Sequence, residues 1–281
     1  MRKLKLVVMQ MIRNNINKVL LMLLVSQLVW VTGFGQSTKP WNNHQAAVVL
    51  TYDDAIDQHI DNAIPVLDSL GLSATFYITG YSSSVKARMN EWKQLVLKGY
   101  ELGNHTLYHP CVGGAGREWV KADYDLSKYT VQRMLDETRM NNLFLQALDG
   151  KTKRTFAFTC GDMKIGDSSF INAMKADFIA ARAVREEMHT IEKVDLYNVD
   201  CYPVNGQTAD QMMDWVKQAI ASKSLLVILF HGVGGGNSLN VALPEHRRFL
   251  QWLAKQNKDV WVAPMITVAE YVKQYQSNQK P

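Results

Sequence analysis

Short apolar runs alternate with amphipathic segments between residues 46 and 264. The apolar and β-branched runs predict buried strands at 46–52, 74–79, 100–105, 154–159, 177–184, 196–202, 225–230 and 260–264. Apolar residues at helical spacing predict intervening helices at 61–71, 89–99, 123–148, 168–176, 208–223 and 244–256. This alternation indicates a parallel sheet covered by helices, closed or nearly closed into a barrel. An open doubly wound sheet is the alternative.

The first 35 residues have a different pattern. Basic residues at positions 2, 3, 5, 13 and 18 precede an apolar stretch at 19–31, and small residues follow. This order is typical of a secretory signal peptide. A membrane anchor is the alternative, but the stretch is shorter than the ~20 residues that a spanning helix requires. We expect residues 1–35 to be cleaved, which leaves an exported, periplasmic or extracellular domain at 36–281 without stable membrane insertion.

Removal of this leader changes the charge of the protein. The leader holds five of the 31 basic residues and no acidic ones, so 26 basic residues remain against 26 acidic ones. A chain without net charge and without a basic run has no electrostatic basis for binding nucleic acid. We therefore expect no nucleic-acid partner. The sequence gives no indication of an oligomeric state.

Polar and chemically active residues follow the predicted strands at the points where the strands end. They are Asp53, Asp54, His105, His109, Cys160 and His231. In parallel barrels the carboxyl ends of the strands meet at the face that holds the active site. We therefore expect these side chains to share one site.

The spacing of His105 and His109 predicts a metal site. Three residues between two histidines put both imidazoles on one side of a turn, and a carboxylate from another strand would complete a catalytic three-ligand set. A nearby cation would also explain the adjacent pair Asp53 and Asp54, because it makes two neighbouring carboxylates tolerable. One aspartate would bind the metal and the other would act as a base. Two surface histidines in a turn are the alternative.

Three motifs resemble those of the polysaccharide deacetylases, the NodB-homology family. Residues 51–54 (TYDD), 105–109 (HTLYH) and 229–231 (LFH) are similar to the first, second and fifth motifs of that family, in its order. The resemblance extends from about residue 46 to residue 264. It implies an α/β fold, a distorted (β/α)7-type barrel of parallel strands in a single domain. It also implies a divalent metal ion, with zinc favoured over cobalt or nickel, and an acetylated glycan as substrate, N-acetylated or in some members O-acetylated.

The resemblance also implies roles for individual residues. Asp53 would be the general base and His231 the general acid, while Asp54, His105 and His109 would bind the metal.

Further residues would act on the substrate side of the site. Leu229 would line the acetyl pocket, and the backbone N–H of Cys160 would stabilise the oxyanion. Thr106 would brace the histidine loop by hydrogen bonds. Tyr108 and Trp119 are candidates for stacking on sugar rings.

The chain departs from the family pattern in three motifs. Ala55 replaces the usual glycine after the aspartate pair. Ala157 and Thr159 stand where an arginine and a proline are usual, and Arg182 is our candidate for the missing cation; a solvent-facing charge is the alternative. The fourth motif is not recognisable, and Asp200 is either its replacement or an ordinary strand residue. These changes leave open a catalytically impaired glycan-binding barrel. An unrelated metallohydrolase barrel would need ligands at other strand ends, which the sequence lacks.

The remaining signals concern cysteines, glycines and histidines. A disulfide between Cys111 and Cys160 would join two rim loops in an oxidising compartment, although Cys201 follows a strand on the same face. Residues 232–238 (GVGGGNS) lack a phosphate-loop signature and predict a flexible rim loop. The other histidines belong to no constellation and are expected at the surface: His44, His59, His189 and His246.

Overall fold

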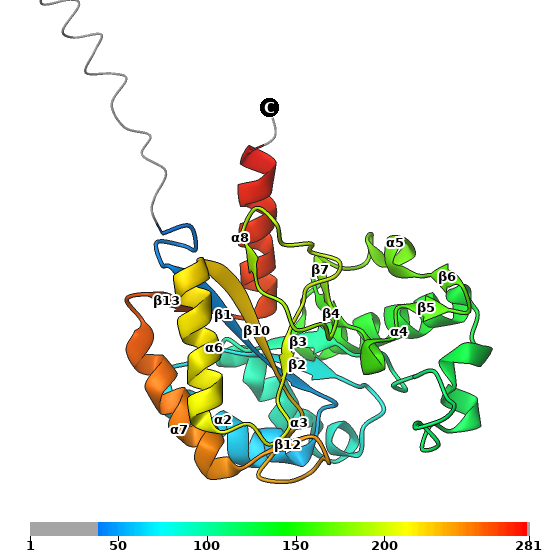
Figure 1. Ribbon diagram of the computed structural model, residues 1–281. Coiled ribbons are helices and arrows are strands. Elements are labelled where there is room, and N and C mark those ends of the chain that lie inside the picture. Colours follow the sequence, from blue (N-terminus) through cyan, green and yellow to red (C-terminus); the bar gives the residue numbers. More distant parts are fainter. Residues whose placement is uncertain (1–38, 280–281) are drawn as a thin grey trace, which may run out of the picture. The chain divides into compact units, whose positions relative to one another are not determined.

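The computed structural model describes residues 39–279, and one sheet runs through the centre of this part of the chain (Figure 1). Its strands follow the order β7-β4-β3-β2-β1-β10-β8, with β13 also on β1 and β9 also on β10. All pairs in this sheet are parallel except that of β8 with β10. These strands are β1 (Ala46–Asp53), β2 (Thr75–Ile78), β3 (Glu101–Asn104), β4 (Thr155–Ala157), β7 (Ala180–Arg182), β8 (His189–Thr190), β9 (Tyr202–Pro203), β10 (Ser224–Phe230) and β13 (Val260–Val262).

The sheet curves into a half-barrel, and residues 199–203 span its opening. Val199 forms an isolated parallel bridge with Arg182 of β7, while Tyr202 and Pro203 pair with β10. The predicted α/β barrel fold in a single domain is therefore confirmed. The predicted strand at 196–202 is wrong in extent, because these hydrogen bonds hold it only at Val199 and at β9.

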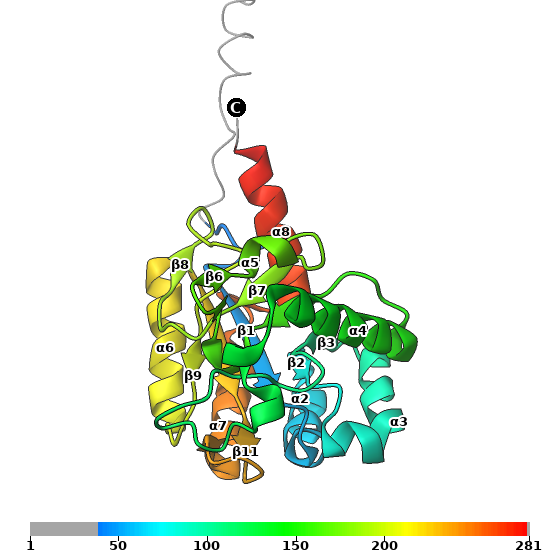
Figure 2. The same cartoon turned by 90° about the vertical axis from the view of Figure 1, so that its right-hand side faces the viewer.

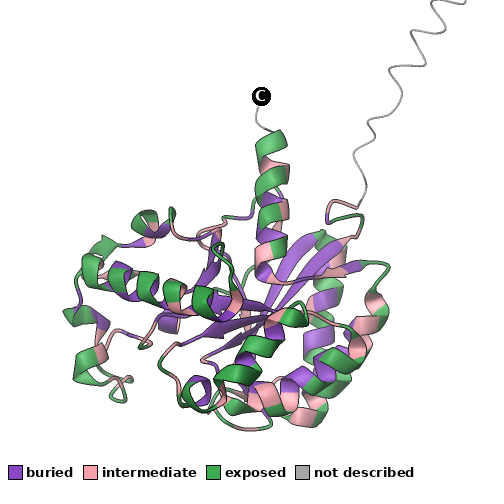
Figure 3. Ribbon diagram, turned by 180° about the vertical axis from the view of Figure 1, so that it is seen from behind, coloured by how far each residue is buried: buried purple, intermediate pink, exposed green. Residues whose placement is uncertain are grey.

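Helices cover the outside of the half-barrel, with α6 and α7 on one side and α3 and α4 on the other (Figure 2). Figure 3 shows buried strands inside and exposed outer helix faces. The helices are α2 (Ile64–Leu70), α3 (Ser83–Leu97), α4 (Val131–Asp149), α5 (Ile171–Met174), α6 (Ala209–Ser222), α7 (Leu243–Leu253) and α8 (Met265–Asn278). Shorter helical turns are η1 (His59–Ala63), η2 (Ala122–Tyr124), η3 (Leu126–Lys128), η4 (Thr159–Gly161) and η5 (Ala254–Gln256). Two-stranded pairs lie outside the main sheet: β5 (Lys164–Ile165) with β6 (Ser168–Ser169), and β11 (Gly232–Val233) with β12 (Asn240–Val241).

The alternation of side chains along β1 separates two cores. Val48, Leu50 and Tyr52 belong to the cluster that contains the buried faces of α2, α6 and α7. Ala47 and Val49 belong to a second cluster with α8. Because successive strand residues point to opposite faces, Asp53 continues the row of Ala47 and Val49 and faces the inside of the half-barrel.

Several helices differ from the expectations. The helix expected at 89–99 begins already at Ser83, and the one expected at 168–176 is confined to Ile171–Met174. The helix expected at 123–148 begins only at Val131, where the Thr130 side chain accepts a hydrogen bond from the backbone N–H of Arg133. The helix α8 was not expected at all. Its buried Met265, Val268 and Val272 seal the inner core at the start of β1.

The predicted signal peptide, residues 1–35, lies outside the described residues. Within 39–279, no helix is both long and apolar enough to cross a membrane.

Candidate active site

Both aspartates of the opening motif reach one cavity, although they are consecutive in the chain. Asp53 ends β1 on its inner face, whereas a regular strand would turn Asp54 outward. Asp54 instead has a positive φ of 81°, followed by Ala55 at 54°. This left-handed turn brings Asp54 to the cavity as well. Alanine therefore occupies a left-handed conformation that a glycine, as usual in this motif, would adopt without strain.

The histidine loop after β3 is held by hydrogen bonds to its own backbone. The Oδ1 atom of Asn104 accepts from the N–H of Thr106, and Thr106 Oγ1 accepts from the N–H of His109, both at 2.8 Å. Thr106 and His109 both have positive φ, 63° and 58°. The predicted bracing by Thr106 is therefore present. It holds a strained turn that points both imidazoles at Asp54.

Asp54, His105 and His109 present a compact set of ligand atoms. Oδ1 of Asp54 lies 3.5 Å from Nε2 of His105 and 3.3 Å from Nε2 of His109. One ligand atom from each residue lies within 4.8 Å of the others. One carboxylate oxygen and two imidazole nitrogens are a donor set that suits zinc and similar divalent ions.

The outer nitrogens of both histidines are engaged elsewhere. Nδ1 of His105 donates to the backbone carbonyl of Ala157 at 2.9 Å, so its Nε2 is the bare nitrogen. Nδ1 of His109 lies 3.6 Å from Sγ of Cys111. Because a disulfide sulfur carries no hydrogen, His109 is the donor in this weak contact, and Nε2 is the bare nitrogen of its neutral ring. The set thus fits a divalent cation in protonation as well as in composition.

The electrostatics of the set favour a charged carboxylate. Burial opposes ionisation of Asp54, but hydrogen bonds from His105 and His109, formed when their Nε2 atoms carry protons, outweigh it and hold the pKa of Asp54 well below its ordinary value. Burial likewise opposes protonation of His109, yet the Asp54 carboxylate raises the pKa of His109 above its ordinary value. A bound cation would take the place of these protons.

Arg182 supplies the cation beside Asp53. Its guanidinium donates to Oδ2 of Asp53, and both side chains are buried. Further hydrogen bonds run from Arg182 to the carbonyl of Ala183 at 3.1 Å and to Sγ of Cys201 at 3.5 Å. Arg182, which the sequence analysis named as a candidate for the missing cation, therefore contacts the predicted base. The alternative, a solvent-facing charge, is wrong.

His231 lines the same cavity from the end of β10, but its side chain has no charged partner in hydrogen-bonding range among the described residues. Its Nδ1 is buried without a hydrogen bond. Asp200 instead accepts from Arg185 at 2.9 Å and from His189 at 2.7 Å. Burial lowers the pKa of His231 below its ordinary value, with the charges of Asp53 and Asp54 acting in the opposite direction.

Asn237 is a site residue that the sequence analysis missed. It belongs to the glycine-rich segment 232–238, lines the cavity and donates from Nδ2 to Oδ2 of Asp54 at 3.1 Å. Gly232 in this segment has no room for a Cβ, which would lie 2.6 Å from the carbonyl oxygen of Gly235. The segment is thus a tightly folded rim loop that reaches the metal-ligand set. An asparagine among glycines gives no chemical signal in a single sequence.

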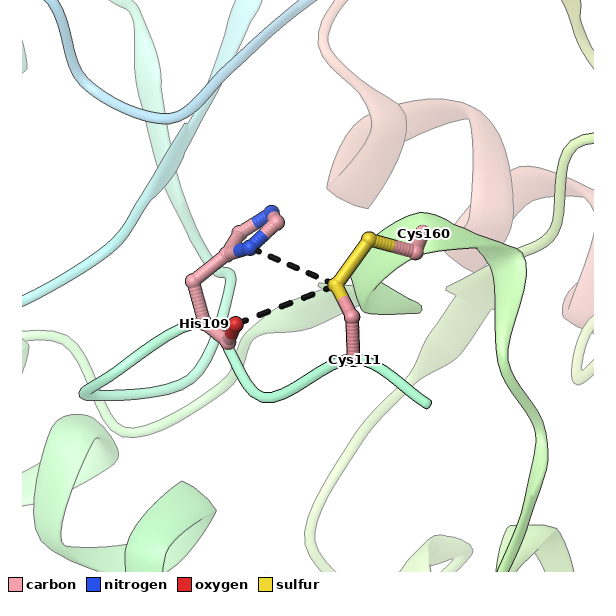
Figure 4. A group of neighbouring side chains, drawn as sticks. All are labelled: His109, Cys111 and Cys160. Carbon is pink, nitrogen blue, oxygen red and sulfur yellow. Dashed lines mark hydrogen bonds between the residues drawn. A yellow bond between two sulfur atoms is a disulfide. The ribbon is translucent and has the colours of Figure 1, made fainter. Parts of the chain in front are cut away.

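A disulfide joins Cys111 to Cys160, with 5.8 Å between the Cα atoms (Figure 4). The predicted bridge is confirmed, and Cys201 is the free, buried thiol. Figure 4 shows that the bridge lies beside the His109 ring. It ties the histidine loop to the turn η4, where Cys160 has a positive φ of 54°.

The cavity has a volume of about 710 Å³ and places the polar set beside apolar walls. Leu229 and Cys160, both predicted from the sequence, line it, and so does the exposed Trp119. Tyr108 is not among the lining residues; its ring stacks on Tyr124 at 5.2 Å. The polar residues that line it are Asp53, Asp54, Thr79, His105, His109, His231, Asn237 and Ser238.

Backbone strain is concentrated at this site. Of the eight non-glycine residues with positive φ in 39–279, five belong to its loops: Asp54, Ala55, Thr106, His109 and Cys160. Such conformations cost of order 1–3 kcal/mol each and persist where the surrounding structure enforces them. Their clustering supports a functional role for this face.

The surface position expected for the remaining histidines is wrong for two of them. His59 and His246 are fully buried, whereas His44 and His189 are partly exposed. Burial lowers the pKa of His59 to about 4 and that of His246 to about 3. Both therefore stay neutral near pH 7.

The comparisons with known proteins decide the family. Residues 42–176 match the polysaccharide deacetylase family model. This part of the chain belongs to the polysaccharide deacetylase family. The sequence-based resemblance is thereby confirmed over this stretch, and the family that it matches is generally dependent on divalent metals.

Solved structures of polysaccharide deacetylases share the fold. A "probable polysaccharide deacetylase" from Pseudomonas aeruginosa PAO1 matches with a TM-score of 0.57 and 10% identity over 83% of this chain and 92% of that one. Peptidoglycan deacetylase PdaC from Bacillus subtilis matches with a TM-score of 0.50 and 16% identity over 84% and 96%. Polysaccharide deacetylase Bc1974 from Bacillus cereus has a TM-score of 0.50 and 16% identity over 78% and 91%. At these identities the likeness establishes the fold.

Proposed function

We propose that this polysaccharide deacetylase family member is an exported, metal-dependent enzyme that hydrolyses acetyl groups from N-acetylated or O-acetylated sugars of a polysaccharide or oligosaccharide. The observation that carries the proposal is the ligand set of Asp54, His105 and His109, which lies in one cavity with Asp53 and His231. A carboxylate base, a pair of imidazole ligands and a third histidine suit metal-assisted acyl hydrolysis.

Asp54, His105 and His109 would hold the cation, zinc by preference with cobalt or nickel as alternatives. When bound, such an ion supplies a Lewis acid that lowers the pKa of water and polarises an acyl oxygen. The bare Nε2 atoms of the two histidines and the low pKa of Asp54 support this assignment.

The chain's own residues would move the protons. Asp53 would accept a proton from the attacking water, and Arg182 fixes one oxygen of Asp53, leaving Oδ1 without a hydrogen bond for this purpose. The backbone N–H of Cys160 would stabilise charge on the acetyl oxygen. His231 would donate a proton to the departing amine or alkoxide.

The residues that line the cavity favour an uncharged glycan as substrate. No lysine or arginine lines the cavity in the part of the chain that the structure describes. A sugar carboxylate would thus find no basic side chain on the wall to pair with. Trp119 is exposed at the wall and offers a ring face to a neighbouring sugar, and Leu229 offers an apolar contact to the acetyl methyl group.

Export is supported by two features of the chain. One is the basic, apolar and small-residue order of residues 1–35. The other is the disulfide, because disulfides persist in oxidising compartments outside the cytosol.

Acetate release tests the proposed function. Protein stripped of metal and then supplied with zinc or cobalt should release acetate from chitin oligomers, acetylated xylan or peptidoglycan fragments. Chelation should abolish the release and metal should restore it. Absence of acetate release from all three substrates, with metal bound, would contradict the proposal.

One observation favours a second candidate, a catalytically impaired glycan-binding barrel. His231 lacks a carboxylate partner, so nothing at hydrogen-bond distance keeps it protonated. Such a protein would bind the same glycans in calorimetric titrations without releasing acetate.

A further inference from the structure

The main chain at His231 is held from outside the cavity, although its side chain is not. Nε2 of His59 donates to the carbonyl oxygen of His231 at 2.8 Å. Asn62 donates from Nδ2 to the carbonyl oxygen of Val233 at 2.7 Å. Both donors belong to the short helical segment η1, so a single element holds the chain just after β10 by two hydrogen bonds.

The ring of His59 is itself fixed by aromatic neighbours. It meets Tyr52 edge-on at 5.5 Å between centroids, Phe76 at 5.8 Å and Trp92 at 6.3 Å. The side chain is fully buried. Because a carbonyl oxygen only accepts hydrogen bonds, Nε2 of His59 carries the proton of the neutral ring. The ring thus holds its donor toward the carbonyl oxygen of His231.

The position of η1 in the chain links this contact to the aspartate pair. The segment begins at His59, five residues after Asp54, and thus continues the turn that presents the aspartate pair. The hydrogen bond from His59 spans 172 positions to reach His231. It connects the turn of the proposed base to the main chain of the proposed acid.

We propose that His59 and Asn62 are positioning residues that set the place of His231 relative to Asp53. The inference rests on the proposed function and deepens it. In this chain the acid histidine would be oriented through its backbone, in place of a carboxylate on its ring. A displacement of about 1 Å at a reacting group is enough to lose 10²-fold in rate.

The leaving group distinguishes this role from simple core packing. An amine leaves only with a proton from the general acid, whereas an aryl oxide leaves without one. His59→Phe keeps an aromatic ring but removes the donor, and His59→Gln offers an amide N–H in its place. We expect His59→Phe to lower kcat/KM on N-acetylglucosamine oligomers 10- to 100-fold and on an aryl acetate by less than 3-fold. His59→Gln should recover most of the loss.

A matched control and a milder variant complete the experiment. His246→Phe alters the other buried histidine, which contacts the hydroxyl of Tyr52 and not residue 231; the ratio of the two activities should stay unchanged. Asn62 is partly exposed, so Asn62→Ala leaves the core intact. It should shift the ratio of the two activities in the same direction as His59→Phe, by a smaller factor.

The outcomes separate this inference from the proposed function. Wild-type activity on both substrates with an unchanged ratio in His59→Phe and Asn62→Ala would overturn the positioning role alone. A glutamine variant no better than the phenylalanine variant would also overturn it. A wild-type protein that releases acetate from neither substrate would overturn the proposed function, and this inference with it.

Discussion

The guanidinium of Arg182 donates a hydrogen bond to the carboxylate of Asp53 from a strand 129 positions later in the chain. Arg182 ends β7 and Asp53 ends β1, and the half-barrel brings both ends to one cavity. Ala157, at the position where the family usually carries its arginine, ends the neighbouring strand β4. The two strands pair in parallel with Ala157 directly opposite Arg182. The positive charge beside the base has thus moved by one strand.

Removal of this guanidinium should impair both stability and turnover. Arg182→Met leaves the buried Asp53 carboxylate unpaired, which typically costs about 3–5 kcal/mol of unfolding free energy. We expect acetate release to fall about 100-fold with bound metal retained, and Arg182→Lys to lose less. Arg185→Met is the control, because Arg185 pairs with Asp200 instead. Wild-type kcat in Arg182→Met would contradict the assignment.

Trp119 should contribute to the binding of oligosaccharides. Loss of one stacked ring costs about 0.5–1.5 kcal/mol, so Trp119→Ala should raise KM for chitin oligomers about 3- to 10-fold and leave aryl acetate hydrolysis unchanged. Leu143→Ala alters an equally exposed apolar residue on α4 and serves as the control. Tyr108→Ala should have the smaller effect, because the Tyr108 ring already stacks on Tyr124. Equal KM values for Trp119→Ala and wild type would exclude the role.

Reduction of the Cys111–Cys160 bond should destabilise the protein. The bond closes a loop of 49 positions, and such bonds typically contribute about 2–4 kcal/mol. Urea unfolding with and without a dithiol reductant measures the difference. A Cys111→Ser/Cys160→Ser double variant should match the reduced protein and show no response to the reductant. Identical unfolding midpoints for the reduced and oxidised wild-type protein would contradict the prediction.

The buried histidines predict a loss of stability on acidification. The pKa of His246 is about 3 in the folded state, against an ordinary 6.5. Between these values the unfolded chain binds the proton and the folded chain does not, so stability falls as the pH falls below about 6.5. Each such group contributes up to about 1.4 kcal/mol per pH unit.

The matching variant is His246→Gln, which keeps a polar partner for Tyr52 but cannot titrate. From pH 6 to pH 5 the unfolding free energy of wild type should drop by about 1 kcal/mol more than that of the variant. Denaturant titrations at the two pH values measure this difference. Equal drops would show that His246 is not buried and neutral.

The fold could be predicted from the sequence because the signals of its strands were strong and local. Continuous apolar runs predicted β1 and β10, and the strand-end positions of Asp53, His105 and His231 placed them on one face. Arg182 could be predicted by the same reasoning, because a charged residue at the carboxyl end of a barrel strand lies at the face that holds the site.

Other features depended on geometry that no local pattern carries. Asn237 reaches Asp54 through a folded glycine loop, and its distance from Asp54 in the chain is 183 positions. His59 looked like an isolated polar residue, whereas three aromatic rings surround it in the fold. The helix α8, in contrast, could have been predicted from the sequence. Its buried residues Met265, Val268 and Val272 stand at helical spacing.

Metal content and acetate release, measured together in Asp53→Asn and Asp54→Asn, distinguish the proposed base from the proposed metal ligand. We expect wild type to bind one equivalent of zinc or cobalt and to release acetate. Asp53→Asn should keep the metal and lose turnover, because only the base is removed, whereas Asp54→Asn should lose both. Equal metal loss in the two variants, or acetate release from metal-free wild-type protein, would show that these roles are wrong.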